Sequence, residues 1–340
     1  MAASTCPAPN PFFTSLEGLK AQLSQWKGIK PPKVYSDPDY LTNYRGCMVN
    51  YPLSLNLNEL DTFEPRSTDI CVAAFPKTGT TWMSALVYML VNGADPKSLL
   101  SGPPLKFKMP YLEMTVPCGE KLDKEIKALD YLKAKQGERT YLTHLNSNAI
   151  PQDILKTAKV VYIYRNPKDT IVSMYHFMKA AIWHGFNGSL EQMVDDFVTD
   201  KCMNAPFFEH VEGYWKLRNS PNIFVTSYEE LSRDPKATVA KLAEFLKVEV
   251  TDEEVNAVCR QATFSQMRDN PLTNMAELES LGLINARFSR FFRTGEVGNW
   301  KRFFTPEMDR KVDEWIAKNM ADRPGLYDMK FEYELDYDLD

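Results

Sequence analysis

A strand, a short polar turn and a helix follow one another directly within residues 70–90, and this unit constrains the fold more than any other part of the chain. The apolar, β-branched run 70–75 ends at Pro76, and a turn with one Lys, one Gly and three Thr follows. Apolar residues then recur at helical spacing, at Met83, Leu86, Val87 and Leu90. Such a turn directs backbone N–H groups and a helix N-terminus towards an anion. The sequence therefore predicts a phosphate site, with a positive charge from Lys77 and further donors from the Thr hydroxyls.

The same turn differs from the glycine-rich loop of nucleotide-hydrolysing enzymes. That loop reads Gly-x-x-x-x-Gly-Lys-Ser/Thr, whereas here Lys77 precedes Gly79 and no glycine lies within reach upstream. Taken alone, residues 76–79 would be an ordinary surface turn. The strand before them and the helix after them make phosphate binding the better interpretation. The missing loop argues against a small-molecule kinase that uses ATP and Mg²⁺.

The composition is typical of a globular protein, and its net charge is negative. Of 340 residues, 44% are hydrophobic and 25% charged, enough for a large core in one domain or two. No apolar run approaches membrane-spanning length, and the N-terminus has neither the basic segment nor the apolar core of a signal peptide. The six Cys are scattered without metal-ligand spacing, as expected for reduced thiols in the cytoplasm. The net charge of −5 argues against a nucleic-acid or membrane-surface binder, so an anionic ligand requires local cations. The candidates are Lys77, Arg165, Arg293 and Lys301.

Alternating strands and helices predict an α/β fold with a central parallel sheet flanked by helices. The strand candidates are residues 69–75, 139–143, 159–164 and 222–227. Helix start signals are Asn166-Pro167, Asp234-Pro235, Thr305-Pro306 and the capping-box spacing of Thr251 and Glu254. Ligands of such sheets bind beyond the carboxyl ends of the strands. We therefore expect the turn at 76–81, His144 and Arg165 to share one cleft.

Three further segments have distinct compositions. Residues 1–65 show little periodicity and are expected to form an irregular wrap with one short helix around 15–26. Residues 270–300 contain aromatic and basic clusters with few regular signals, and we expect them to form a lid over a nucleotide. The acidic tail 331–340 is expected to be solvated or weakly ordered, without a chemical role.

Three motifs together resemble those of the cytosolic sulfotransferases. Residues 75–82 (Phe-Pro-Lys-Thr-Gly-Thr-Thr-Trp) resemble the family's 5′-phosphosulfate loop, and residues 164–177 resemble its 3′-phosphate segment. Residues 293–301 are similar to its C-terminal Arg-x-Gly-x-x-Gly-x-Trp-Lys signature. The resemblance spans roughly residues 51–318 in order and spacing. It implies a single domain over 1–340, related to nucleotide kinases. Such a domain transfers a sulfuryl group from 3′-phosphoadenosine 5′-phosphosulfate (PAPS) to a hydroxyl or amine of a small acceptor. The product is adenosine 3′,5′-bisphosphate (PAP), and no metal is needed.

The resemblance also implies roles for individual residues. His144 matches the catalytic base, which suits an imidazole that titrates near neutral pH. Lys77 matches the residue that stabilises the leaving phosphate, and Ser173 matches a serine thought to restrain that lysine. The nucleotide contacts implied are, for the 5′-phosphate, Lys77, Thr78, Gly79, Thr80 and Thr81; for the 3′-phosphate, Arg165, Ser173, Arg293, Thr294 and Gly295; and for the adenine, Trp82, Tyr228, Thr263 and Phe264.

Several of these residues also have ordinary structural interpretations. Trp82 could equally pack in the core, and Ser173 could be a surface hydroxyl. The candidate acceptor walls, Phe107, Tyr111, Phe177 and Trp183, with Phe291 from the lid, suit a flat phenolic or steroid-like acceptor but are equally consistent with core packing. The remaining histidines, His176, His184 and His210, are interpreted as structural, without metal-ligand spacing.

The chain departs from the family pattern at two places. Leu142 stands where many members carry a second Lys, which either leaves more of the electrostatic work to Lys77 and His144 or shifts the acceptor preference. In the segment 301–310, which matches the family's dimer motif, Pro306 replaces Val and Arg310 replaces the acid. We therefore expect a monomer, or a dimer that does not use this motif. A non-catalytic nucleotide-binding protein of the same fold stays open as an alternative, and the absence of an N-terminal anchor disfavours a Golgi enzyme.

Overall fold

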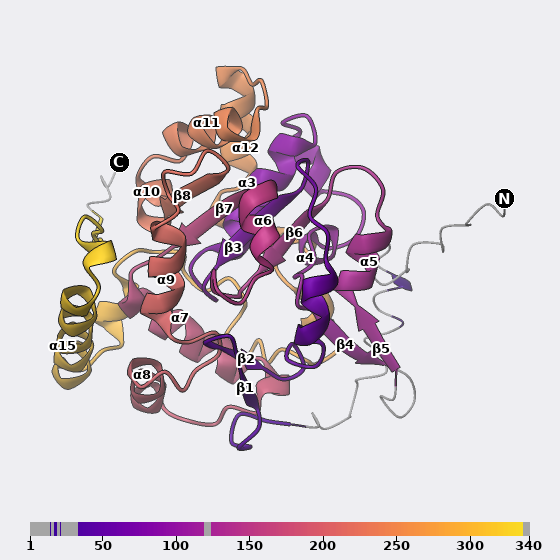
Figure 1. Cartoon of the computed structure of the whole chain (residues 1–340). Helices are drawn as coiled ribbons and strands as arrows, with labels where there is room; N and C mark the ends of the chain where they lie inside the picture. The colour runs from indigo at the N-terminus through magenta and orange to yellow at the C-terminus, as the bar shows by residue number, and fades with distance from the viewer. Residues whose placement is uncertain (1–13, 15–16, 19–20, 22–32, 119–123, 336–340) are drawn as a thin grey trace.

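Four parallel strands form the central sheet in the order β6–β3–β7–β8 (Figure 1). The computed structural model describes residues 14, 17–18, 21, 33–118 and 124–335. The strands are β3 (Ile70–Ala74), β6 (Thr140–Thr143), β7 (Lys159–Tyr164) and β8 (Ile223–Ser227). Each lies within one residue of a strand predicted from the sequence, so the α/β prediction is confirmed. The short helix expected around 15–26 falls outside the continuously described residues.

Both faces of the sheet are buried, which explains the unbroken apolar run of β7. Its residues alternate between two core clusters: Val160 and Tyr162 face one, while Val161 and Ile163 face the other. Strand β3 lies between β6 and β7, with Val72 opposite Leu142 on one side and Val161 on the other. Strands covered on both sides have no polar face to expose, so they do not alternate in polarity.

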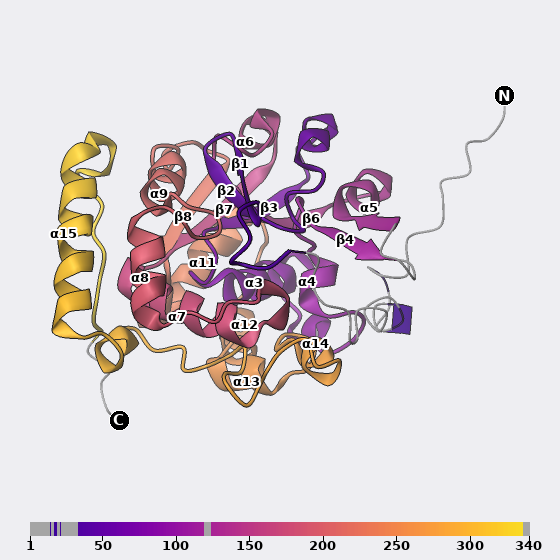
Figure 2. The same ribbon diagram turned by 90° about the horizontal axis from the view of Figure 1, so that it is seen from below.

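Helices cover each face of this sheet. One face is covered by α3 (Thr80–Val91), α11 (Pro235–Leu246) and α12 (Asp252–Gln261). The other is covered by α6 (Gln152–Thr157), α7 (Pro167–Ala180), α8 (Leu190–Val198), α9 (Phe207–Trp215) and α15 (Pro306–Asp322). Figure 2 shows α15 as the outermost helix, next to α8.

Shorter elements complete the described chain. They are the hairpins β1 (Leu41–Tyr44)–β2 (Cys47–Asn50) and β4 (Thr115–Cys118)–β5 (Lys124–Lys127); the helices α4 (Leu105–Lys108), α5 (Ala128–Ala134), α10 (Tyr228–Arg233), α13 (Phe264–Asp269) and α14 (Ala276–Ser280); and the 3₁₀ turns η2 (Leu57–Thr62), η3 (Pro96–Leu99), η4 (Ile182–His184), η5 (Asn299–Arg302) and η6 (Pro324–Leu326). A third, smaller core cluster joins α4, β5 and α14 through Phe107, Ile126, Leu278, Leu283 and Ile284.

The predicted helix starts are confirmed by their caps. The Asn166 side chain accepts from the Asp169 N–H at 2.8 Å, and Pro167 occupies the first helical position of α7. Thr251 and Glu254 form the reciprocal capping box of α12. The side chains of Asp234 and Thr305 cap α11 and α15 by accepting from the backbone N–H three residues further on. Because α3, α7 and α10 begin directly after β3, β7 and β8, three helix N-termini meet at the carboxyl edge of the sheet.

Two segments are better packed than their composition predicted. Residues 41–50 form a β-hairpin whose Cys47 and Val49 are fully buried in the core, so the irregular description of 1–65 is wrong there. Residues 331–335 dock on the body of the protein, because Phe331 packs against Phe208 with ring centroids 6.0 Å apart. The expectation of a weakly ordered tail is therefore wrong for these five residues.

Candidate active site

The turn between β3 and α3 is tight, and its glycine is required by the surroundings. Gly79 has φ 110°, and a Cβ there would lie 2.8 Å from Tyr228 Cδ2 and 3.0 Å from Ile163 Cδ1. Lys77 also adopts a positive φ of 73°, an uncommon conformation for a residue with a side chain. The turn leads into the N-terminus of α3, where the Thr80 hydroxyl is buried without a hydrogen-bond partner among the described residues. An unsatisfied buried donor at a helix N-terminus suits an anion.

The residues predicted for the site lie around one cavity of about 560 Å³. Lys301, one of the four candidate cations for the anionic ligand, does not line it and forms an ion pair with Glu334, so that expectation is wrong. With one exception, each residue that the resemblance assigned to catalysis, nucleotide binding or acceptor binding lines this cavity: Lys77, Gly79, Thr80, Thr81, Trp82, Phe107, Tyr111, His144, Arg165, Ser173, Phe177, Trp183, Tyr228, Thr263, Phe264, Arg293, Thr294 and Gly295. They come from distant segments, which the parallel topology brings to the same sheet edge.

Thr78 is the exception. It is fully buried, and its hydroxyl donates to the carbonyl oxygens of Phe75, at 2.8 Å, and Ile163, at 3.1 Å. These bonds tie the turn to β7 and use the hydroxyl proton. The prediction that the Thr78 hydroxyl contacts a phosphate is therefore wrong.

His144 is held in one tautomer by its surroundings. Its Nδ1 lies 2.6 Å from the carbonyl oxygen of Ala74, which can only accept, so Nδ1 carries the proton and Nε2 has a free lone pair. The backbone N–H of His144 donates to Glu113 Oε1 at 2.7 Å, and its carbonyl accepts from Asn204 Nδ2 at 2.8 Å. Burial lowers the pKa of His144 to about 4, the Ala74 bond opposes this, and the nearby Lys77 charge lowers it further. The ring is therefore neutral at pH 7 and able to accept a proton.

Lys77 sits near two other cations, Arg165 and Arg293, and forms no ion pair with any described residue. Its Nζ lies 4.4 Å from the centroid of Phe177 and 4.3 Å from that of Phe291. Burial lowers the pKa of Lys77 to about 7, and the charges of Arg165 and Arg293 lower it further. Within the described chain Lys77 makes no hydrogen bond to Ser173, so the restraint expected of that serine is not formed here. Such crowding of positive charge is relieved when an anion binds.

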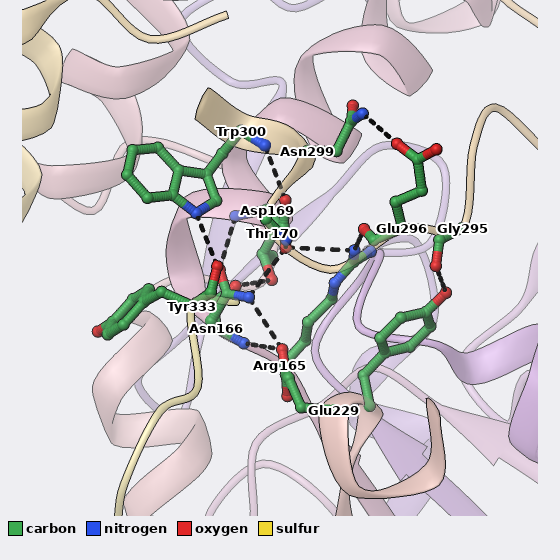
Figure 3. Close-up of polar contacts among 12 residues, drawn as sticks. Arg165, Asn166, Asp169, Thr170, Glu229, Gly295, Glu296, Asn299, Trp300 and Tyr333 are labelled. Atoms are coloured by element: carbon green, nitrogen blue, oxygen red, sulfur yellow. Dashed lines mark hydrogen bonds and ion pairs between the residues drawn. The ribbon is translucent and has the colours of Figure 1, made fainter. Parts of the chain in front are cut away.

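Arg165 extends from the end of β7 towards the loop 295–300 (Figure 3). Its Nη2 donates to the carbonyl oxygen of Glu296 at 2.6 Å and lies 3.4 Å from Asp169 Oδ2. Its guanidinium carbon lies 4.1 Å from the ring centroid of Tyr228. Its Nε is buried and has no hydrogen-bond partner in the described structure. Arg165 thus keeps a spare donor within a positively charged part of the cavity.

Aromatic rings form the wall next to these cations. Trp82 and Tyr228 meet edge to face with centroids 5.2 Å apart, and the Tyr228 hydroxyl donates to the Gly295 carbonyl at 2.6 Å. Phe264 lies so close to Gly295 that a Cβ there would be 2.4 Å from Phe264 Cδ2. The glycine lets the loop approach the ring, which leaves a flat apolar slot suited to a purine.

The opposite part of the cavity contains residues that the sequence analysis missed. His184 was interpreted as structural, but it lines the cavity next to Trp183, and its Nδ1 is hydrogen-bonded to the Tyr40 hydroxyl. Asn50 and Lys106 also line it, and Lys106 forms an ion pair with buried Glu277 at 2.6 Å. The only sequence signal that could have found His184 is its position directly after Trp183. Asn50 lay in a segment interpreted as irregular, so it had none.

The described residues lack two further features. No three of their His, Cys, Asp and Glu side chains gather in a way that could hold a metal ion. None of their helices is both long and apolar enough to cross a bilayer.

Comparison with known proteins places the chain among sulfotransferases. The sulfotransferase domain model matches residues 67–324. Sulfotransferase 1B1 of Canis lupus familiaris is 31% identical over 277 residues, which cover 81% of this chain and 91% of that protein. The amine sulfotransferase of Oryctolagus cuniculus is 29% identical, with 87% and 94% of the two chains covered. The crystal structure of mouse sulfotransferase SULT7A1 complexed with PAP is similar with a TM-score of 0.65 at 25% identity, covering 83% of this chain and 94% of that one. Retinol dehydratase, solved with androsterone and PAP, has a TM-score of 0.72 at 23% identity over 84% of this chain and 91% of that one, which shows the shared fold.

Proposed function

Because this chain belongs to the sulfotransferase family, we propose that it transfers the sulfuryl group of PAPS to a hydroxyl or amine group of a small, phenolic or otherwise hydrophobic acceptor. One observation carries the proposal. A single cavity holds two buried donors that have no hydrogen-bond partner among the described residues, Thr80 Oγ1 and Arg165 Nε. Lys77 and His144, whose protonated Nδ1 leaves Nε2 to accept a proton, line the same cavity. Unsatisfied buried donors are costly, and phosphate oxygens at two positions would satisfy them.

The two ends of PAPS fit different parts of this cavity. Thr80, Thr81 and the N-terminus of α3 would hold the 5′-phosphosulfate. Arg165, Ser173 and Arg293 would hold the 3′-phosphate, because guanidinium groups match its oxygens geometrically. The slot of Trp82, Tyr228 and Phe264 would hold the adenine.

The residues can then perform an in-line transfer. Nε2 of His144 takes the proton from the acceptor as its oxygen or nitrogen forms a bond to sulfur. The bond between sulfur and the bridging 5′-phosphate oxygen breaks, and its electron pair stays on that oxygen. The Lys77 ammonium stabilises the negative charge that develops there. The rings of Phe177 and Phe291 lie against Lys77 and form apolar walls. These walls keep water away from the ammonium and so strengthen its interaction with the leaving oxygen.

The acceptor region supports an apolar substrate with one reactive group. Phe107, Met114, Trp183, Leu278 and Leu283 line it. The name of the rabbit relative indicates an amine substrate, so amines stay in the proposed range together with phenols. We further propose a cytoplasmic, single-domain enzyme. We propose that it is a monomer, or a dimer that does not use residues 301–310, because Pro306 begins α15 there and removes a backbone donor.

The experiment that tests the function compares ligands and then chemistry. Calorimetry should detect PAP binding and much weaker binding of ATP with Mg²⁺, since the turn lacks the glycine-rich loop of kinases. Labelled sulfuryl transfer from PAPS to a panel of phenols and arylamines should then give product. Preference for ATP with Mg²⁺ would favour a kinase instead. Tight PAP binding without transfer to any member of the panel would favour a non-catalytic nucleotide-binding protein.

The pH dependence should show two limbs set by His144 and Lys77. His144 can act as a base only when its ring is neutral, so kcat/KM for PAPS should fall as the pH is lowered through about 4. Lys77 works only when protonated, and its pKa of about 7 in the free enzyme makes kcat/KM fall as the pH rises above 7. Bound phosphates raise the pKa of Lys77, so the alkaline limb of kcat should lie at higher pH. A Lys77→Arg variant should lose the alkaline limb, because guanidinium stays charged; an unchanged limb in this variant would contradict the assignment.

A further inference from the structure

The loop 295–300 is held by the 3′-phosphate arginine and by one buried carboxylate. The side chain of Asp169 is almost fully buried and accepts from the backbone N–H groups of Gly298, at 2.8 Å, and Trp300, at 2.9 Å (Figure 3). Its Oδ2 also lies 3.4 Å from Arg165 Nη2. Arg165 in turn donates to the Glu296 carbonyl. The geometry of Arg165 and the path of this loop are therefore coupled through Asp169.

The far side of the same loop rests on residues 331–334. The indole Nε1 of Trp300 donates to the carbonyl oxygen of Tyr333 at 3.3 Å, as Figure 3 shows. Gly298 has φ 82°, and a Cβ there would lie 3.1 Å from the Tyr333 carbonyl oxygen, so only glycine fits without displacing the tail. Lys301 forms an ion pair with Glu334. The loop is thus enclosed between Asp169 and the tail.

The tail has anchors of its own on the nucleotide side of the fold. Phe331 packs against Tyr164, the residue before Arg165, with ring centroids 6.1 Å apart. Lys168 Nζ lies 4.3 Å from the Trp300 ring centroid and 5.3 Å from that of Tyr333, and it forms an ion pair with Asp313 at 2.6 Å. Glu332 pairs with Arg233 at the end of α10.

We propose that residues 331–334 act as a positioning brace, which keeps the loop 295–300 ordered before the nucleotide arrives and so raises nucleotide affinity without touching the nucleotide. This inference rests on the proposed function for the identity of the ligand. A loop that is ordered beforehand loses less conformational entropy on binding. Because Trp300 is buried, its N–H also has no water to replace the Tyr333 carbonyl.

The test uses a pair of matched tryptophan variants. Trp300→Phe keeps an aromatic ring and removes the N–H bonded to Tyr333, together with part of the ring volume. Trp215→Phe makes the same ring exchange outside the loop 295–300, at a half-buried indole that donates to exposed Asp328 at 3.0 Å and packs against Tyr164. Losing one such bond should raise the calorimetric Kd for PAP by about fivefold in Trp300→Phe. Trp215→Phe should leave this Kd unchanged, and kcat at saturating PAPS should be unchanged in both.

Two further measurements separate bracing from a general loss of stability. Tyr333→Ala, which loosens the tail without altering the loop, should raise the Kd for PAP in the same direction. Hydrogen–deuterium exchange of the unliganded protein should be faster at the Gly298 and Trp300 amides in Trp300→Phe than in the unsubstituted chain. Equal Kd and equal exchange in Trp300→Phe would overturn the brace, as would an equal rise in Kd for Trp215→Phe. Absence of PAP binding by the unsubstituted chain would instead contradict the proposed function, and the exchange rates would still decide whether the brace exists.

Discussion

Replacing His144 with Ala is expected to lower kcat by about 10²- to 10⁴-fold, the range that a positioned general base contributes. The imidazole is prepared for this role, since the Ala74 carbonyl fixes the proton on Nδ1 and burial keeps the ring neutral at physiological pH. The affinity for PAP should change little, because the residues proposed to hold its 3′-phosphate and adenine come from other segments. Single-turnover measurements with saturating PAPS would give the rate of the chemical step directly.

Free imidazole provides a control for this variant. The vacated volume opens into the cavity, so added imidazole should restore part of the rate of His144→Ala, more strongly above the pKa of free imidazole than below it. Normal turnover in His144→Ala with tight PAP binding would show that another group removes the proton. Loss of PAP binding together with activity would point to a collapsed site, which the thermal midpoint would reveal.

Replacing Lys77 with Met is expected to lower kcat by about 10²- to 10³-fold, as found when one group that stabilises transition-state charge is removed. The affinity for PAP should fall much less. In the unliganded protein burial and the charges of Arg165 and Arg293 lower the pKa of Lys77 to about 7, so near neutral pH part of its attraction to PAP is offset by the free energy of protonating it. The transition state gains more from the protonated Lys77, because new charge appears on the leaving oxygen.

The comparison of kcat with the Kd for PAP decides between two roles of Lys77. A large loss of kcat with nearly unchanged Kd supports stabilisation of the leaving group. A large loss of affinity with unchanged kcat would make Lys77 a binding residue only. Met is chosen because its length and apolar character suit the space between Phe177 and Phe291, so the surrounding rings need not move.

The sequence predicted the sheet, and the convergence of the candidate site residues on one cavity, well, for physical reasons. After Lys159, strand β7 consists of β-branched and aromatic residues, and helices α7 and α12 carry explicit caps at Asn166 and Thr251. Parallel strands place their carboxyl ends at one edge, so the turn at Lys77, His144 and Arg165 had to converge once the strands were known.

Features that depend on tertiary contacts escaped prediction. Nothing in the local sequence shows that the Thr78 hydroxyl turns to the carbonyl of Ile163, a bond between residues 85 positions apart. The His184 ring is hydrogen-bonded to the Tyr40 hydroxyl, and the two residues are 144 positions apart in the sequence. Net acidity predicted a solvated tail, but Phe331 and Tyr333 supply enough apolar surface for the described part of it to dock.

The small cluster built on Phe107, Ile126 and Leu278 has a consequence for how such enzymes diversify. It packs apart from the two large cores, whereas one phenol, that of Tyr228, links the phosphate turn, the Arg165 guanidinium and the loop at Gly295 into a single unit. Mutations in the small cluster can reshape the wall proposed for the acceptor, which Phe107 and Leu278 line, while the part proposed for the donor keeps its form. A lineage could therefore explore new substrates one wall at a time, at little risk to the chemistry they all share.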